Sequence, residues 1–248
     1  MNDSKVGGMQ LKGLEELNIR IKLFLLLLLS AGTVCSLALG VYLRHHTGES
    51  IYLFLNWDMF LAWVPAGLAL LLDMVFVYFK QPAAVRRLLL IVLGLMWLFF
   101  YPNSAYLITD MLHPFNYYHP VYGSFLIDIE FWYHLFLFFS AAMIGLFLGI
   151  YSLYSVQTLV SQAFGRIVGW VFAVGVLLLS SLGIFIGRFI RWNSWDVLSE
   201  PLTILKDTHF ILTNAGQLRL LIPFTSIIFV LTLLTYSFVY SFTYLKRS

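Results

Sequence analysis

Charged side chains are scarce in this chain, and their scarcity excludes the ordinary soluble class of protein. Asp, Glu, Lys and Arg together make up 11% of the 248 residues, whereas hydrophobic residues make up 60%. A soluble domain carries about 25% charged and roughly 45–50% apolar residues, so its interior could not hold this apolar surplus. The sequence predicts a protein that faces a lipid bilayer. Its net charge of +3 gives no indication of nucleic acid, and we expect no nucleic-acid partner.

Cysteine is nearly absent, since Cys35 is the only one. One cysteine excludes a disulfide within the chain and a cysteine metal cluster. The sequence also lacks a compact zinc pattern such as His-Glu-x-x-His, a Walker-type loop and a glycine-rich nucleotide fingerprint. We therefore expect neither a metal nor another cofactor, although acids and histidines follow one of the apolar runs.

Long apolar runs, by contrast, are abundant. About 20 apolar residues in a helix cross about 30 Å of hydrocarbon, and six runs are long enough. They predict an all-α, six-transmembrane-helix bundle in a single domain, residues 21–245, after an N-terminal tail, residues 1–20, that has no fold of its own. The first run is long enough to span and five more follow, which favours a span over a cleaved leader. The predicted spans are residues 21–43, 58–79, 87–109, 131–154, 167–189 and 218–244.

The distribution of Lys and Arg predicts the orientation of these spans. If both termini are cytoplasmic, ten of the 15 basic residues fall on the inner side, as the positive-inside rule requires. The residues 102–130 and 190–217 then form the two large outer connections. The five outer basic residues are Arg44, Arg188, Arg191, Lys206 and Arg219.

The third predicted helix is interrupted at Pro102. Pro102 lies 15 residues beyond Arg87, or roughly 22 Å, which is short of the far edge of the hydrocarbon. Proline removes a backbone donor, and Asn103 and Ser104 can satisfy the carbonyl groups that lose their partner. One interpretation is a simple proline kink. The other is a broken third helix whose second half, from Ser104, aims its N–H groups into a pocket, with Asp110 and His113 one turn apart at its outer end.

Opposite charges are predicted to meet near this break. The 102–130 connection carries acids and histidines but no Lys or Arg, whereas Arg188 and Arg191 end the fifth helix. On a continued helix these arginines share a face, and guanidinium groups suit carboxylate or phosphate partners. Pairing with the acidic connection and snorkelling to lipid phosphates both remain open.

Two acids lie within the second predicted span. Asp58 is expected at the interface. Asp73 lies closer to the inner end, where it is either a buried partner for a basic residue or exposed to water.

The connection between the fifth and sixth spans predicts an interfacial helix over residues 196–214. Leu198, Leu202 and Leu205 share one helical face, Ser199 is the expected N-cap, and Pro201 fits the first turn. This helix is expected to cover the outer end of the bundle.

Pairs of glycines at helical spacing occur in the fourth and fifth spans. Because a glycine has no Cβ, such pairs predict close packing between these two helices. The pairs are Gly145/Gly149, Gly165/Gly169 and Gly183/Gly187.

Three segments carry a family resemblance: YPNSAYLITDMLH, WYHLFLFFSAAMIGLFLGIYSL and LGIFIGRFIRWNSWDVL. Together they resemble the bacterial polytopic membrane family known as domain of unknown function 1361, over about residues 90–200. The chain departs from that pattern at Ser104-Ala105, where a second proline is usual, and at His134, where an acid is typical. The resemblance implies topology and location, and leaves the chemistry open. The residues to which it points are Pro102, Asn103, Tyr106, Asp110, His113, Arg188, Arg191, Asn193 and Asp196.

These observations favour a bacterial plasma-membrane protein with a polar outer-leaflet pocket for an anionic or lipid-linked envelope ligand. Arg188 and Arg191 would contact the anion, while Asp110 and His113 are the candidates for proton transfer or hydrogen bonding. Whether a reaction follows binding is left open by the sequence. A small-solute permease or membrane-embedded transporter subunit, and a structural partner in an envelope complex, remain alternatives. The expected ligand-binding set is Asn103, Tyr106, Asp110, His113, Arg188, Arg191, Asn193 and Asp196.

Overall fold

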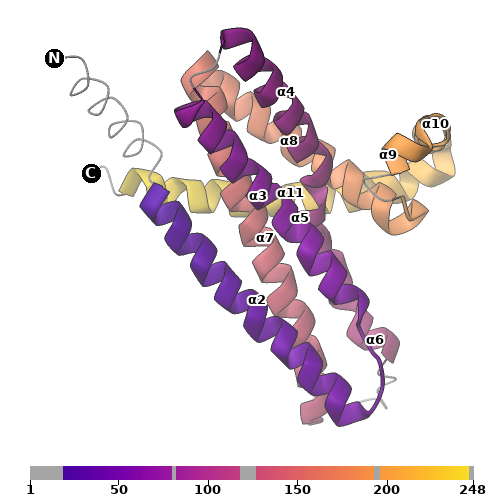
Figure 1. Cartoon of the computed structure of the whole chain (residues 1–248). Coiled ribbons are helices and arrows are strands. Elements are labelled where there is room, and N and C mark those ends of the chain that lie inside the picture. The colour runs from indigo at the N-terminus through magenta and orange to yellow at the C-terminus, as the bar shows by residue number, and fades with distance from the viewer. Residues whose placement is uncertain (1–18, 80–81, 118–126, 193–195, 246–248) are drawn as a thin grey trace.

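The computed structural model describes residues 19–79, 82–117, 127–192 and 196–245. Most of these residues are in helices, which short connections join, and none is in a strand (Figure 1). The predicted tail, residues 1–20, lies almost wholly outside this range. The elements are α2 (Ile19–Thr47), α3 (Phe54–Tyr78), α4 (Ala83–Phe100), α5 (Pro102–Tyr106), the 3₁₀ helix η1 (Leu107–Leu112), α6 (His113–Tyr117), α7 (Ile129–Phe164), α8 (Arg166–Phe185), the π-helical segment η2 (Ile186–Ile190), α9 (Asp196–Ser199), α10 (Pro201–Thr213) and α11 (Ala215–Leu245).

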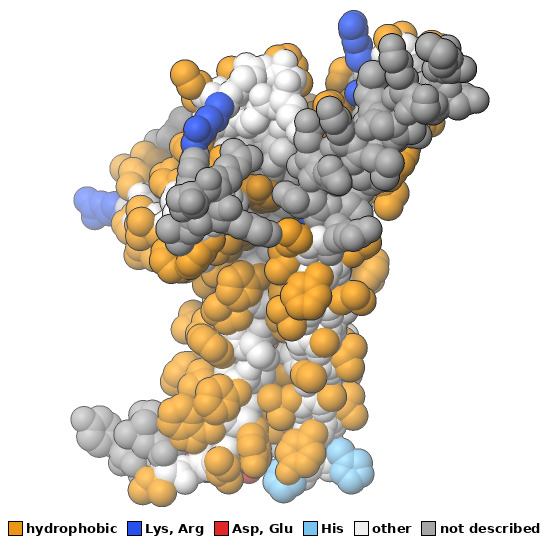
Figure 2. Space-filling model, turned by 90° about the vertical axis from the view of Figure 1, so that its left-hand side faces the viewer, with side chains coloured by type: hydrophobic (Ala, Val, Ile, Leu, Met, Phe, Trp, Pro, Cys, Tyr) orange, Lys and Arg blue, Asp and Glu red, His pale blue; other side chains and the backbone are white. Residues whose placement is uncertain are grey.

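Six of the helical stretches are long and apolar enough to cross a membrane, by length and composition, which confirms the predicted all-α six-helix class. The third stretch runs from Ala83 to Asn116 through α4, α5, η1 and most of α6, so it is broken by changes of helix type and remains helical. Figure 2 shows one face of the molecule covered largely by hydrophobic side chains, with Lys and Arg toward one end and His at the other.

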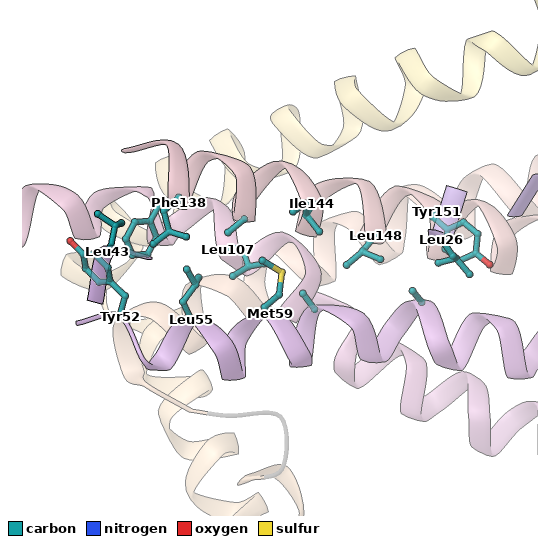
Figure 3. Packing of buried hydrophobic residues seen from close by; sticks show 14 of the residues in the cluster. Leu26, Leu43, Tyr52, Leu55, Met59, Leu107, Phe138, Ile144, Leu148 and Tyr151 are labelled. Carbon is teal, nitrogen blue, oxygen red and sulfur yellow. The ribbon is translucent and has the colours of Figure 1, made fainter. Parts of the chain in front are cut away.

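Helix α7 is the central column of the fold. It packs against α2, α3, α5, η1, α6, α8 and α11, and its apolar stretch is the most deeply buried of the six. Phe138 and Leu148 of α7 meet Leu107 of η1 and Met59 of α3 in one buried cluster (Figure 3). Because lipid tails are as apolar as these side chains, close van der Waals packing, and not removal from water, holds such helices together.

The break in the third span fits against glycines of α7 and α8. A Cβ at Gly145 would collide with the backbone carbonyl of Ser104, and a Cβ at Gly183 would lie 2.9 Å from Cγ of Pro102. Gly149 likewise faces Ser104, and Gly187 faces Tyr106. The expectation that these glycines join the fourth and fifth helices is therefore wrong, because α5 and η1 occupy the space between them.

The third glycine pair behaves as expected at one position. A Cβ at Gly169 of α8 would collide with the Ser161 side chain of α7, so these helices do approach closely there. Gly165 instead takes φ of 96° at the turn between α7 and α8, a left-handed conformation that favours glycine.

We predict that Gly145→Ala lowers the free energy of unfolding by about 1–3 kcal/mol, because the added methyl group must displace the Ser104 carbonyl from α7. Thermal unfolding of the purified protein in detergent measures the change. Gly175→Ala in α8 is the matched control, since nothing lies within 4 Å of its Cβ position. Equal melting temperatures for the two variants would contradict this account of the packing.

A buried ion pair joins three helices at the end of the bundle where α2 begins. The Nζ atom of Lys22 in α2 lies 2.7 Å from Oδ2 of Asp73 in α3, and it also donates to Oγ of Ser155 in α7 at 2.6 Å. The Ser155 hydroxyl donates in turn to Asp73 at 2.5 Å. All three residues are buried. Of the two roles left open for Asp73, the structure shows the buried partner of a basic residue.

We predict that Lys22→Met destabilises the protein by about 3–5 kcal/mol, because it leaves the Asp73 carboxylate buried and unpaired. The double variant Lys22→Met/Asp73→Leu removes both charges and should recover most of that loss. Chemical unfolding in mixed micelles measures each variant, and Lys206→Met, at an exposed lysine, should be neutral. A double variant no more stable than the single one would argue against charge burial as the cause.

The connection between α8 and α11 is helical, as predicted, but Glu200 divides it. Ser199 ends α9, while Glu200 is the N-cap residue of α10 and Pro201 occupies its first turn. The N-cap prediction for Ser199 is therefore wrong. Buried Ile211 packs α10 onto α8 and α11, whereas Leu202 and Leu205 are 71% and 66% exposed, so these two leucines point away from the bundle.

Candidate functional site

The Arg188 guanidinium and the Asp110 carboxylate meet at the opposite end of the bundle. Nη1 of Arg188 donates to Oδ1 of Asp110 at 3.0 Å, although 78 residues separate them. The Asp110 side chain is 2% exposed and the Arg188 side chain 23%. The predicted convergence of the acidic connection with the end of the fifth helix is therefore present in the structure for this pair.

Local helix geometry determines which arginine takes part. The π-helical turn over Ile186–Ile190 widens the end of α8 and carries Arg188 toward η1. Arg191 then adopts φ of 66° and ends the helix, so it does not share a face with Arg188. Arg191 is exposed and has no ion-pair partner among the residues that the structure describes. The prediction that both arginines converge on the acids is wrong for Arg191.

Aromatic and polar groups enclose the ion pair. The Nδ1 atom of His113 lies 3.0 Å from the backbone oxygen of Asp110 and 3.5 Å from its Oδ1. The His113 ring also packs on Phe54 and Phe138, with ring centroids 4.6 and 5.5 Å away. These contacts fix the ring beside the carboxylate, so His113 is placed by α3 and α7 as well as by its own turn.

Two further side chains of the third and second spans act on Arg188. The Tyr106 hydroxyl is close enough to interact electrostatically with its guanidinium, and Asp58 of α3 is close enough to do so with both Arg188 and Asp110. The site thus holds two carboxyl groups for one guanidinium. Oδ2 of Asp110 is buried without a hydrogen-bond partner among the described residues.

A cavity of about 410 Å³ adjoins this cluster, and we call it the α3–α8 cavity. Asp58, Asn103, Tyr106, Ser180 and Trp192 are its polar or amphipathic lining residues. Its other walls are mainly apolar and include Leu98, Phe99, Leu179 and Ile204 of α10. Phe99 and Leu179 are about half exposed, at 50% and 55%, so the apolar side of the cavity reaches the surface of the molecule.

The structure places most of the predicted site residues in two groups and leaves Asp196 outside them. Asn103 and Tyr106 line the cavity, whereas Asp110, His113 and Arg188 form the ion-pair cluster behind Tyr106 and are not among the described lining residues. Asp196 begins α9 and is partly buried, outside both groups. Asn193 lies outside the described residues.

Of the two side chains predicted to satisfy carbonyl groups at the break, that of Asn103 does so, whereas that of Ser104 bonds to another helix. The Asn103 amide nitrogen donates to the Phe100 carbonyl at 3.0 Å, and the Ser104 hydroxyl donates to the Ala62 carbonyl of α3 at 3.2 Å. The Ser104 N–H itself bonds to the Tyr101 oxygen at 3.2 Å. The hypothesis that N–H groups from Ser104 onward are aimed into a pocket is wrong at that residue, because helical geometry continues through the break.

Of the polar or amphipathic residues that line the cavity, sequence reasoning missed three. Asp58 had a usable signal, since an acid within an apolar run is a functional-site candidate by default, yet it was assigned only to the interface. Ser180 and Trp192 carried no such signal, because a serine in a span and a tryptophan near its end are ordinary. Trp192 is fixed by its indole N–H, which donates to Asp207 of α10 at 3.0 Å.

A second polar cluster surrounds His134, which is fully buried in α7. Its Nδ1 atom lies 3.0 Å from the Tyr52 hydroxyl, and its Nε2 atom lies 3.9 Å from Oε1 of Glu130, four residues earlier on the same helix. Tyr52 adopts φ of 57°, which is rare for a tyrosine. Within the described ranges, no three His, Cys, Asp or Glu residues are grouped so that they could hold a metal ion.

The fold and this site define an all-helical protein with six apolar, membrane-length helices and a buried Arg–Asp pair beside an amphipathic cavity. The sequence model of the proteins of unknown function named DUF1361 matches residues 57–240, and the chain belongs to that family. No curated protein and no solved structure matches the chain.

We predict that Asp110→Asn and Arg188→Gln each destabilise the protein by about 2–4 kcal/mol, because each leaves a largely buried charge without its partner. The double variant should be more stable than either single variant. Arg191→Gln is the matched control and should leave stability unchanged, since Arg191 is exposed. Melting temperatures in detergent test all four proteins, and an effect of Arg191→Gln equal to that of Arg188→Gln would refute this assignment.

Proposed function

We propose that this protein is a multi-pass bacterial plasma-membrane protein, with cytoplasmic termini, that binds an amphiphilic envelope ligand in the α3–α8 cavity. The six apolar helices and the exposed apolar side chains support membrane insertion. The excess of Lys and Arg on the side of the termini supports the orientation. The observation that carries the ligand proposal is the division of the cavity lining into a polar and an apolar part.

The polar part of the lining suits a head group, and the apolar part suits a chain. Asp58, Asn103 and Tyr106 supply a carboxylate, an amide and a hydroxyl on the side next to Arg188. Leu98, Phe99 and Leu179 form the wall toward the lipid-facing surface. A ligand whose chain remains among the lipids and whose head enters the bundle satisfies both parts without burying an unpaired polar group.

The charges narrow the choice of head group. Arg188 is already paired with Asp110, and Asp58 adds a second carboxyl group, so the deep polar region repels a bare anion. Hydroxyl or amine donors match these oxygens better. Arg191, exposed and one residue before Trp192 of the cavity wall, is the basic side chain left for a phosphate at the cavity mouth. A lipid-linked sugar, with hydroxyl groups next to a phosphate, has this chemistry.

The two alternatives have less support. A permease needs a polar path between the two ends of the bundle, but the α3–α8 cavity shares no described lining residue with the other large crevice, which lies between α2, α7 and α11. A purely structural role predicts that Arg188 snorkels to the lipid phosphates. Its guanidinium instead bonds a carboxylate inside the protein.

Binding of defined lipids to the purified protein tests this proposal. The probes are a long-chain prenyl phosphate, the same lipid carrying one sugar, and phosphatidylethanolamine. We expect the sugar-bearing lipid to raise the melting temperature most, and Tyr106→Phe and Asp58→Asn to reduce its affinity about tenfold through the loss of a hydrogen bond or charge contact. Tyr42→Phe, at an exposed tyrosine that does not line the cavity, is the control.

The outcome that contradicts the proposal is equal stabilisation of the wild type and Tyr106→Phe, or no stabilisation by any of the three lipids. In a deletion strain under envelope stress, wild type and Tyr42→Phe should restore growth, whereas Asp58→Asn should not.

A further inference from the structure

A second amphipathic crevice, of about 610 Å³, lies at the end of the bundle where α2 begins and α11 ends, and we call it the α2–α11 crevice. Leu25 and Leu28 of α2, Phe147 of α7 and Phe242 of α11 belong to its apolar walls, and all four are well exposed. Lys22 and Tyr151 lie among its polar lining residues. None of its described lining residues belongs to the α3–α8 cavity.

Two hydrogen-bond donors at this crevice are left over. The Lys22 ammonium group has three N–H donors, of which two are used by Asp73 and Ser155. The Tyr151 side chain is 7% exposed, and its hydroxyl has no hydrogen-bond partner among the described residues. In Figure 3 this hydroxyl points away from Leu148 and the rest of the apolar cluster. A buried hydroxyl without a partner costs about 1–3 kcal/mol, so an acceptor is expected there.

Lys22 and Tyr151 therefore offer donors to an acceptor-rich group, next to walls that suit a hydrocarbon chain. The charge of Lys22 is balanced by Asp73, so a single phosphate enters next to a neutral pair and not next to a bare carboxylate. An ammonium group supplies donors only, so it cannot accept the hydrogen bonds that Lys22 and Tyr151 offer. Aromatic rings of Trp170, Tyr236 and Tyr240, packed together with centroids 4.7–6.1 Å apart, support the crevice from α8 and α11.

We propose that the α2–α11 crevice binds a phospholipid, with the lipid phosphate accepting hydrogen bonds from Tyr151 and Lys22 and one acyl chain lying along Leu25, Leu28 and Phe147. This site is separate from the proposed envelope-ligand site. It would join a lipid of the leaflet nearer the termini to α2, α7 and α11.

Native mass spectrometry of the full-length protein with chain-matched lipids tests the proposal. We expect dioleoylphosphatidylglycerol to be retained about tenfold more than dioleoylglycerol, which has no phosphate, and Tyr151→Phe to abolish most of this preference. Tyr133→Phe is the control, because Tyr133 lies on the same helix 18 residues away, or about 27 Å. Asp58→Asn, at the other cavity, should also retain the phospholipid.

Leu25→Trp provides an independent variant that fills the chain-binding wall and leaves Tyr151 and Lys22 in place. It should lose both lipids while its melting temperature in detergent stays close to that of the wild type. Equal retention of the two lipids by the wild type, or equal retention of phosphatidylglycerol by Tyr151→Phe and Tyr133→Phe, overturns the proposal. Displacement of phosphatidylglycerol by inorganic phosphate at the same concentration also overturns the proposal, because the crevice would then be a site for free phosphate and not for a phospholipid.

Discussion

The close contact between the Ser104 backbone and Gly145 is the constraint on which the half of this fold that holds Asp110 and Arg188 depends. Where Ser104 lies against α7, a side chain on α7 would displace it, so the third span passes between α7 and α8 only because Gly145 and Gly183 leave room. The short α5 and the 3₁₀ helix follow from this position. They bring Asp110 to the inside of the bundle, opposite the π-helical end of α8.

Each end of the bundle then faces the same electrostatic problem. A charge in an apolar medium is stable only with a partner, and the structure supplies one across helices in both places: Lys22 with Asp73, and Arg188 with Asp110. The two pairs differ in their surroundings. Ser155 completes the first, and each pair leaves one carboxylate oxygen without a partner within the described structure, Oδ1 of Asp73 and Oδ2 of Asp110. The second pair has in addition a further acid, Asp58. That excess of acceptors is the reason the adjoining cavity suits a head group rich in donors.

The α3–α8 cavity and the α2–α11 crevice have the same arrangement of side chains. In each, a polar lining next to a buried ion pair continues into an apolar wall that reaches the surface of the molecule. In soluble proteins such walls would be covered by other helices. Here Phe99 and Leu179 on one side, and Leu28 and Phe242 on the other, remain exposed. Exposure of this kind is stable among lipid chains, and under the proposed function it would allow an amphiphile to enter from the side without leaving the bilayer.

The sequence alone determined the helical class, the six membrane-length stretches and the position of the break, because apolar run length and proline act locally. It also indicated that Asp110 and Arg188 meet, since unlike charges near the same end of a bundle attract one another. It could not show that Arg191 turns away, because a π-helical turn and one left-handed residue decide that. Nor could the sequence show that Gly145 packs against Ser104, or that Lys22 pairs with Asp73, 51 residues away. Those partners follow from how the helices pack, and packing depends on side-chain shape at contacts between segments far apart in the chain.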